Sequence, residues 1–515
     1  MINTIHAIPD AGGPVGTNTS CGTVDVDQAV DNVLDARGNG DPTQVLLDEL
    51  SRCCTPEEAK AILDELQRRE PDRWTDFVNA TELGRLEGSG YPASGLTALA
   101  DAIAAKHAEG SLDQDELFSL FGFGIAGFGP QQERGAQMLF GASNSQAMQD
   151  FEAAMATMAM DILAGADRHR ASHGTDVQIT GWANNVIAGL GVDALSRQAL
   201  FDAYASPDRD AAERQHIREL LADKDSVGYD THSPDALAGL IVALAESGGR
   251  GTDLAVEMAN WAGDNQEYFV ENDIFSQRTS DSRTEALSRL LISHSDAIFD
   301  DLTDGYDNPG QYAADDARRL GFLLGVTAFN PDNLFGEAVA SKLDDYTRDQ
   351  ADIVAVDPQS AEAQSALGRL EILSPALLIA QSLPFLGNLE SNEARVNGIL
   401  RIIDTVVTIG SLVPTGKFAD FLFDLYGTVE GLTDAQIEAG LEQYLTGLMS
   451  GSPEEIEAGL QELADMVDAG IQAEYGDNPV VAGAMSRRLE DTLYDMLLAI
   501  ANNDVSDYLE THHDG

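Results

Sequence analysis

Two segments, Thr55-Pro-Glu-Glu58 and Ser452-Pro-Glu-Glu455, decide the fold class of this chain. In each segment the Thr or Ser oxygen can accept a hydrogen bond from the backbone N–H three residues later, and the Glu at that position can reach back. The proline suits the first helical position because its missing N–H would have no partner there. Both segments are therefore predicted to begin helices.

The pairing of a capping residue with proline recurs along the chain. Ten of the 17 prolines follow Ser, Thr, Asp or Asn. Apolar residues at helical spacing follow the two complete boxes, and we find no run of alternating β-branched residues. The sequence predicts an all-α fold of irregular multi-helix bundles, with stacked helical hairpins as the alternative. The ten pairs are Asp41-Pro42, Thr55-Pro56, Ser206-Pro207, Ser233-Pro234, Asn308-Pro309, Asn330-Pro331, Asp357-Pro358, Ser374-Pro375, Ser452-Pro453 and Asn478-Pro479.

Length and composition divide the chain into a leader and three helical domains. At 515 residues it is too long for one core. Residues 1–24 are rich in Gly, Thr, Asn and Pro and are expected to form a disordered leader. Polar stretches at 165–178 and 351–361 are expected to separate the helical parts. The predicted domains are an N-terminal one at 25–165, a central one at 178–350 and a C-terminal one at 360–510 with apolar central helices.

The chain is strongly acidic, since 87 Asp and Glu against 30 Lys and Arg give a formal net charge of −57 at pH 7. This charge disfavours binding to nucleic-acid phosphates or anionic lipid, so no nucleic-acid partner is expected. Only five basic residues are lysines, and the carboxylates are spread along the whole chain. Such a coat suits concentrated salt, where charges are screened within about 3 Å at roughly 1 M. We expect adaptation to high salt; an acidic protein secreted or kept unfolded for export is the alternative.

Cysteine usage and the N-terminus bear on localisation. The three cysteines Cys21, Cys53 and Cys54 cannot make a disulfide framework, and the absence of a CxxC pair excludes a zinc ribbon. Residues 1–9 lack both the basic and the apolar region of a Sec signal peptide. The expected location is the cytoplasm, or the exterior by a Sec-independent route.

Two short motifs resemble known kinds of binding site. Gly122-Phe-Gly-Ile-Ala-Gly127 matches GxGxxG but follows a helical pattern rather than a strand, so no nucleotide cofactor is expected. His169 and His173 are four residues apart, with Asp167 and Asp176 nearby, and on a helix they would share one face. They are the candidate metal ligands, with solvated surface histidines as the alternative.

The acidic turn Asp300-Asp-Leu-Thr-Asp-Gly305 resembles a calcium loop only superficially. With Gly305 in the sixth position, Leu302 and Gln311 fall where carboxylate ligands are needed, so an EF-hand is excluded. Among 87 carboxylates the sequence singles out no acid–base pair, and catalytic residues stay unassigned. No cofactor is expected.

Residues 367–430 are the least ordinary segment of the chain. The 18 residues of 372–389 carry no formal charge, while Arg401 and Asp404 interrupt the apolar stretch at 399–413. This length is at the lower limit of a bilayer span. We expect two central helices buried in a bundle; a membrane-inserting hairpin hidden in the soluble form is the alternative.

The residue pattern of 190–350 resembles that of a known class of proteins. Stretches such as Ser233-Pro-Asp-Ala-Leu-Ala-Gly-Leu-Ile-Val-Ala-Leu-Ala-Glu-Ser-Gly-Gly249 are similar to helical, non-toxin regions of large bacterial secreted effector and polymorphic-toxin proteins. The resemblance implies a delivery or packing scaffold and assigns no functional residue.

Three functions stay open at this point. A non-catalytic interaction or scaffold protein with a protein partner, exported as a bacterial effector, fits the absence of catalytic motifs. A membrane-active effector would act through 367–430, the one segment through which a membrane partner is expected. An enzyme would need a site assembled from distant helices, with converging titratable groups in a pocket.

Overall fold

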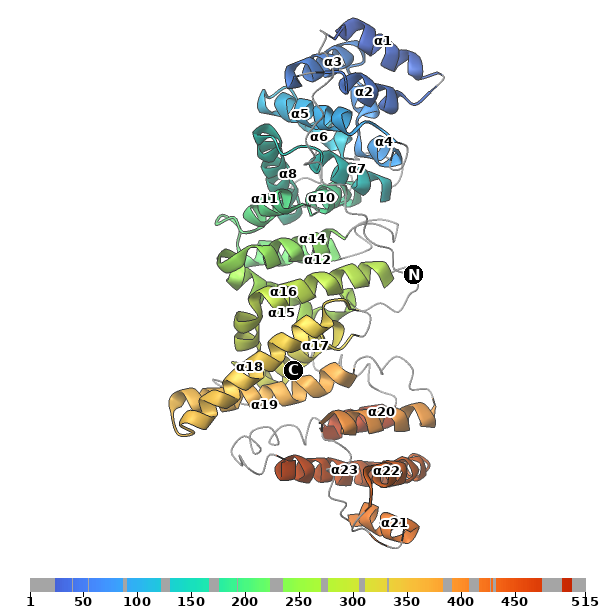
Figure 1. The fold of residues 1–515 in the computed structure, drawn as a ribbon, viewed down its shortest axis with the longest axis vertical. Coiled ribbons are helices and arrows are strands. Elements are labelled where there is room, and N and C mark those ends of the chain that lie inside the picture. Colours follow the sequence, from blue (N-terminus) through green and yellow to red (C-terminus); the bar gives the residue numbers. More distant parts are fainter. Residues whose placement is uncertain are drawn as a thin grey trace. The chain divides into compact units, whose positions relative to one another are not determined.

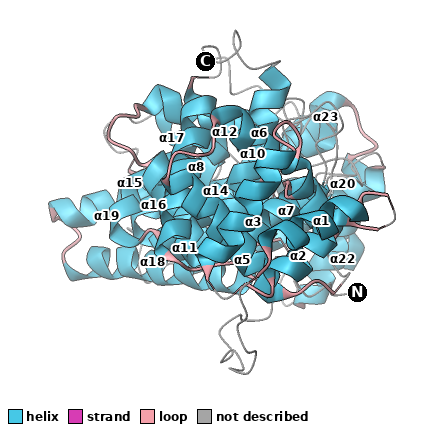
Figure 2. Ribbon diagram, turned by 90° about the horizontal axis from the view of Figure 1, so that it is seen from above, coloured by secondary structure: helices cyan, strands magenta, loops and turns pink. Residues whose placement is uncertain are grey.

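The structure is a computed structural model of the chain (Figure 1). The regular elements of the described residues are helices, as Figure 2 shows, and no strand occurs among those residues. The prediction of an all-α, multi-helix fold is confirmed. The described residues are 24–38, 40–53, 55–86, 90–121, 130–165, 176–191, 193–222, 235–269, 277–304, 311–330, 333–382, 391–406, 416–426, 428, 432–474 and 493–502.

The chain divides into two compact units. Unit 1 comprises Met1–Gly124 and Gln131–Ala154, and unit 2 comprises Ile125–Pro130 and Met155–Gly515. The predicted leader at 1–24 lies outside the described residues except for its last residue. The boundaries of the three helical domains stay a prediction.

Unit 1 consists of short helices whose starts follow the capping rules. Asp41 Oδ1 accepts backbone hydrogen bonds from Thr43 at 3.0 Å and Gln44 at 3.2 Å. Thr55 Oγ1 accepts one from Glu58 at 3.3 Å. Both predicted starts are confirmed. The helices are α1 (Val26–Ala36), α2 (Pro42–Leu50), α3 (Pro56–Arg69), the 3-10 helix η1 (Trp74–Phe77), α4 (Ala80–Arg85), α5 (Ala93–Ala108), α6 (Gln114–Leu120), α7 (Pro130–Phe140) and the first part of α8 (Gln146–Ala164).

Glycines bring helices of unit 1 into backbone contact. A Cβ on Gly84 of α4 would lie 1.8 Å from the carbonyl oxygen of Gln131, and one on Gly135 of α7 would lie 1.7 Å from that of Ala80. Gly95 of α5 approaches the backbone of α2 in the same way, at 2.0 Å. No side chain fits at these distances, so each close approach requires glycine.

Unit 2 is built from longer helices that pack mainly on helices close to them in sequence. α14 packs on α11 and α16, α17 and α18 pack on α19, and α20 packs on α19 and α22. The helices are the rest of α8, α10 (Asp176–Leu190), α11 (Ala194–Tyr204), α12 (Ala211–Ala222), α14 (Ala236–Glu246), η2 (Gly248–Gly251), α15 (Thr252–Asp264), η3 (Gln266–Tyr268), α16 (Gln277–Thr303), α17 (Gln311–Thr327), α18 (Gly336–Val356), α19 (Ala361–Ser382), α20 (Asn392–Val406), α21 (Gly416–Tyr426), α22 (Asp434–Leu448), α23 (Pro453–Glu474) and helical residues 493–502.

The capping box of α23 is confirmed, because the Ser452 N–H donates to Glu455 Oε2 at 2.8 Å and the Glu455 N–H donates to Ser452 Oγ at 3.3 Å. Two other predicted starts were wrong in position. After Ser206-Pro207 the chain turns, and Asp210 caps α12 by accepting a backbone hydrogen bond at 2.9 Å. After Asp357-Pro358 the cap is Ser360, which accepts one at 3.0 Å. In both cases a second capping residue a few positions on begins the helix.

Ser374-Pro375 was also predicted to begin a helix, but it lies inside α19. An interior proline removes one backbone hydrogen bond and costs about 3 kcal/mol or more. α19 packs along α17 and α18, and Ala376 and Leu378 beside the proline are 0% and 1% exposed. Burial of this face offsets the cost of the proline. The remaining Ser-Pro and Asn-Pro pairs include residues outside the described ranges.

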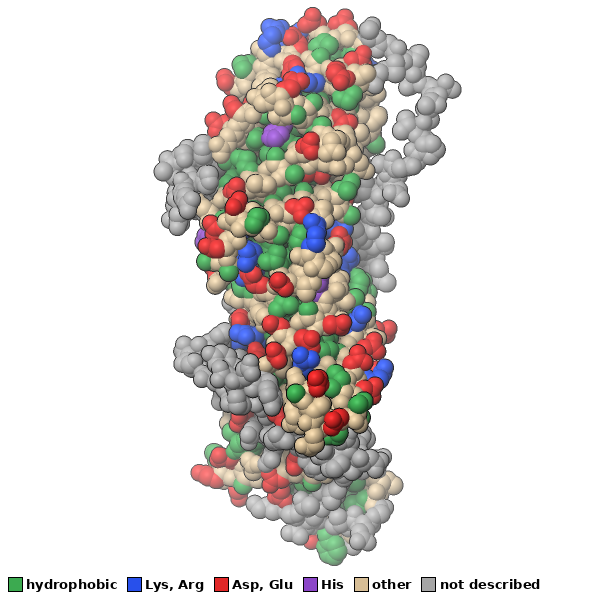
Figure 3. Space-filling view, turned by 90° about the vertical axis from the view of Figure 1, so that its left-hand side faces the viewer, with side chains coloured by type: hydrophobic (Ala, Val, Ile, Leu, Met, Phe, Trp, Pro, Cys, Tyr) green, Lys and Arg blue, Asp and Glu red, His purple; other side chains and the backbone are tan. Residues whose placement is uncertain are grey.

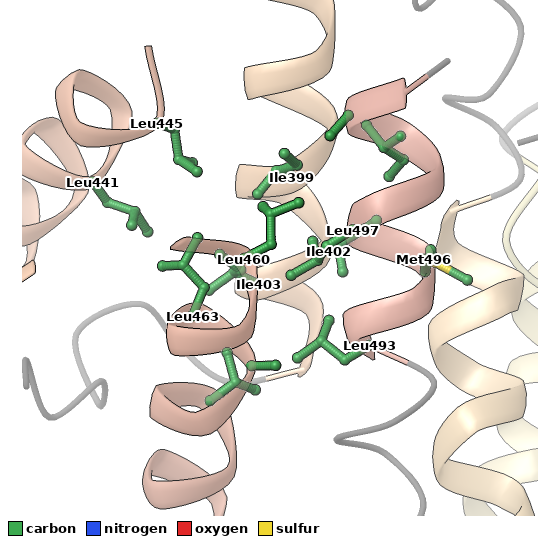
Figure 4. Packing of buried hydrophobic residues seen from close by; sticks show 14 of the residues in the cluster. Ile399, Ile402, Ile403, Leu441, Leu445, Leu460, Leu463, Leu493, Met496 and Leu497 are labelled. Atoms are coloured by element: carbon green, nitrogen blue, oxygen red, sulfur yellow. The ribbon is translucent and has the colours of Figure 1, made fainter. Parts of the chain in front are cut away.

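The C-terminal part of unit 2 has its own apolar core (Figure 4), drawn from α19 to α23 and residues 493–502. Figure 4 shows Ile399, Ile402 and Ile403 of α20 among side chains of α23 and residues 493–502. Ile403 is 0% exposed. Residues 372–382 and 391–406, the described part of the predicted apolar helices, thus supply core side chains.

Candidate functional site

The sequence-predicted binding motifs lie outside the described residues. This holds for His169 and His173, the candidate metal ligands, and for the GxGxxG segment at 122–127. Among the residues that the structure describes, no group of three or more His, Cys, Asp or Glu side chains is placed to hold a metal ion.

The acidic turn at the end of α16 binds protein groups. Asp300 accepts a hydrogen bond from the Tyr346 hydroxyl at 2.9 Å and pairs with Arg369 at 2.7 Å. Asp301 accepts one from the Asn260 amide at 2.7 Å. Leu302, which follows Asp301 in α16, is 1% exposed and belongs to the core. These carboxylates serve helix packing.

A buried polar cluster surrounds Lys106 in unit 1. Its ammonium donates to Asp64 Oδ1 at 2.5 Å and to Gln67 Oε1 at 2.7 Å, and it lies 5.5 Å from the centroid of the Trp74 ring. Glu116 accepts from the Trp74 indole N–H at 2.8 Å and from the Gln67 amide at 2.5 Å. The cluster joins α3, α5, α6 and η1 through groups that satisfy one another.

The electrostatics of this cluster favour a structural role. Burial raises the pKa of the Asp64 carboxyl, but hydrogen bonds and charge from Lys106 and Lys60 outweigh burial and lower its pKa below the ordinary value. Lys60 also pairs with Glu109 at 2.9 Å. Because a lowered pKa keeps Asp64 ionised at neutral pH, it is a poor proton donor there.

A second cluster lies along one face of α15, where Glu257, Trp261 and Asp264 follow one another at helical spacing. Arg214 and Arg218 of α12 pair with Glu257 at 3.0 and 2.6 Å. The Arg218 guanidinium also lies 5.7 Å from the centroid of the Trp261 ring. The first half of this face is therefore covered by arginines of α12.

The second half of the face is covered by arginines of α17. Arg318 and Arg319 pair with the same Asp264 oxygen at 3.3 and 2.6 Å, and Arg319 also pairs with Asp316 at 3.3 Å. Trp261 stacks on Tyr268, with 6.0 Å between ring centroids. We call this set of residues the arginine row; its members are Arg214, Arg218, Glu257, Trp261, Asp264, Arg318 and Arg319.

The ionisation of the arginine row follows from its contacts. Burial raises the pKa of Glu257, but hydrogen bonds and charge from Arg214 and Arg218 outweigh burial and lower it below the ordinary value. Burial raises the pKa of Tyr204, whose hydroxyl accepts from Arg218 at 2.8 Å, to about 12. Both groups therefore keep their usual charge at neutral pH.

Several nitrogen atoms of the arginine row are buried without a hydrogen-bond partner: Arg218 Nε, Trp261 Nε1, Arg318 Nε and Arg318 Nη1. The Arg218 and Arg318 side chains are only 5% and 9% exposed. A buried donor left unpaired costs about 1–3 kcal/mol, and more when it is charged. The arginine row thus holds more N–H donors than the protein's own acceptors use.

Few large apolar side chains are exposed among the residues that the structure describes. In Figure 3 the visible face shows many acidic side chains and fewer basic ones, with apolar side chains between them. Phe423 and Leu425 of α21 are 58% and 39% exposed. Leu334, just before α18, and Val356, the last residue of α18, are 83% and 87% exposed. Single exposed apolar residues are ordinary, but Phe423 is the one aromatic side chain among the exposed large apolar residues of the described part of the chain.

The described part of 367–430 includes residues of α19, α20 and α21. No helix among the described residues has the length and apolarity that a bilayer crossing requires.

Comparison of the chain with protein-family models, with curated proteins and with solved structures gives no match.

Proposed function

We propose that the chain is a non-catalytic helical interaction protein, exported as a bacterial effector and adapted to high salt. The observation that carries the proposal is the pair Phe423 and Leu425 on α21, large apolar side chains exposed on a strongly acidic chain. Aromatic side chains of this kind are common anchors of protein interfaces. The partner would offer an apolar pocket with a basic rim, since charge complementarity steers association.

The polar clusters support binding over catalysis. In the Lys106 cluster and at Asp300 the carboxylates already pair with cations of the chain. The lowered pKa values of Asp64 and Glu257 keep them ionised rather than poised near neutral pH. Such groups fix helices in place, which suits a scaffold.

The membrane-active alternative has one observation in its favour. α21 lies within 367–430, and its exposed Phe423 and Leu425 are the kind of side chain that enters a lipid interface. The net charge of −57 opposes approach to anionic lipid at neutral pH.

Site-specific photo-crosslinking tests the interaction function. A photoreactive phenylalanine analogue at position 423 should yield one dominant protein adduct in target-cell extract, and the adduct should weaken as salt rises. The same analogue at Asp424, an exposed neighbour in α21, is the matched control. Equal adduct patterns from both positions would contradict a specific interface. Leakage of phosphatidylcholine vesicles at acidic pH, abolished by Phe423→Asp, would favour the membrane alternative.

A further inference from the structure

Four hydrogen-bond donors of the arginine row are unpaired, and none of its own buried acceptors is unpaired among the residues that the structure describes. Nε of Arg218, Nε1 of Trp261, and Nε and Nη1 of Arg318 are all N–H donors, and all are buried without a partner. Buried polar groups in folded proteins nearly always find one. Several such donors, brought together from α12, α15 and α17, point to an acceptor that comes from outside the chain.

Charge leads to the same conclusion. Arg218 and Arg318 carry three of the four unpaired donors, and each guanidinium brings a positive charge to the face of α15 inside a chain whose net charge is −57. A hydrogen bond from a guanidinium to an anion is charge-assisted and roughly twice as strong as one between neutral groups. An anion is therefore the acceptor that suits these donors best.

The donors line one turn of α15, and they are well enclosed. Trp261, which faces Arg218, and Asp264, which faces Arg318, are three residues apart on α15, a rise of about 4.5 Å along the helix axis. Arg218, Trp261 and Arg318 are 4%, 6% and 7% exposed. A packed interior of this kind suits a compact ion better than a large organic anion.

We propose that unit 2 binds one halide ion, chloride in saline surroundings, between Arg218 and Arg318, with the indole N–H of Trp261 as a further ligand. The site is independent of the interaction function proposed above. Its occupant completes the hydrogen bonding of α12, α15 and α17, so binding stabilises the folded unit.

The test compares anions at equal ionic strength, so that screening is the same. The thermal midpoint of the full chain should be higher in sodium chloride or bromide than in sodium gluconate, whose anion is too large for the site. The ³⁵Cl resonance should broaden in the presence of the protein, and crystals soaked in bromide should show an anomalous peak beside Arg218 and Arg318.

Three variants make the test specific. Trp261→Phe and Arg318→Gln should each shrink the midpoint difference between chloride and gluconate at least twofold. Arg250→Gln should leave the difference unchanged, because Arg250 is 61% exposed and pairs with Asp202 at the surface. Since each variant is compared with itself in two salts, a general loss of stability does not imitate the effect. If Arg318→Gln does not fold, Trp261→Phe alone decides.

Two results would overturn the site. The first is an equal midpoint of the wild-type chain in chloride and gluconate, with no ³⁵Cl broadening. The second is a chloride effect that Trp261→Phe and Arg318→Gln leave intact, which would place the ion elsewhere.

Discussion

Ile403 lies in the core shared by α20, α22, α23 and residues 493–502, and it is 0% exposed. Ile403→Asp removes its buried side chain, which costs about 2–5 kcal/mol by analogy with truncation to Ala. It also places a carboxylate among the apolar side chains of this core, which adds several kcal/mol. The sum is comparable with the roughly 5–15 kcal/mol that stabilises a whole domain. We expect this part of unit 2 to unfold, and Leu378→Asp on α19, where Leu378 is 1% exposed, to act in the same way.

The assay is hydrogen exchange of peptides from 391–406 and 432–474, run beside circular dichroism melts. Ile403→Val should cost only about 0.5–1.5 kcal/mol, and Phe423→Asp, at a site 58% exposed, should cost about 0.5 kcal/mol or less. Burial raises the folded-state pKa of the new Asp above its unfolded value of about 3.9, so the variant should lose stability as pH rises from 4 towards 7. Normal melts and native exchange in both Asp variants would refute the placement of these helices in a core.

The other predictions concern the net charge, the buried Lys106 and the half-buried Cys53. The thermal midpoint should rise from about 0.05 M to about 2 M NaCl, because screening relieves the repulsion of a −57 chain; a flat or falling midpoint would rule out adaptation to high salt. Lys106→Met should destabilise unit 1 by about 1–3 kcal/mol in a urea melt followed by exchange in α5, since Gln67 and Asp64 lose their shared donor. Lys60→Met, whose lysine is 18% exposed, is the control and should cost less. Burial, with Glu58 and Glu49, raises the pKa of Cys53 to about 11. In a Cys21→Ser, Cys54→Ser background this thiol should therefore react about 100-fold more slowly than free cysteine at pH 8 and accelerate as pH rises. Equal rates at pH 8 would contradict the raised pKa.

Local chemistry made the fold class predictable. The side-chain oxygen of Asp41, Thr55 or Ser452 accepts hydrogen bonds from N–H groups two or three residues later. Four consecutive residues are therefore enough to predict such a helix start. The same rule was wrong at Ser374-Pro375, where packing of α19 against α17 and α18 overrides the local preference. The sequence of two residues does not show whether the helix that contains them will be buried against other helices.

The arginine row could not be predicted, because its members come from three separate helices. The sequence does place Arg214 and Arg218 four residues apart, and likewise Glu257 and Trp261, so that each pair shares a helix face. Nothing in that spacing says that α12 and α17 meet α15, nor which donors stay unpaired.

The glycines at the crossing of α4 and α7 restrict how unit 1 can move. Gly84 and Gly135 each face the backbone of the other helix at a distance that admits no side chain. Residues on the same faces one turn away, such as Thr81 on α4 and Leu139 on α7, carry Cβ atoms, so sliding one helix along the other would bring a Cβ against a carbonyl oxygen. These two helices therefore cannot slide past each other, although such shear is one of the usual ways in which domains change shape. α4 and α7 must travel together as one rigid element.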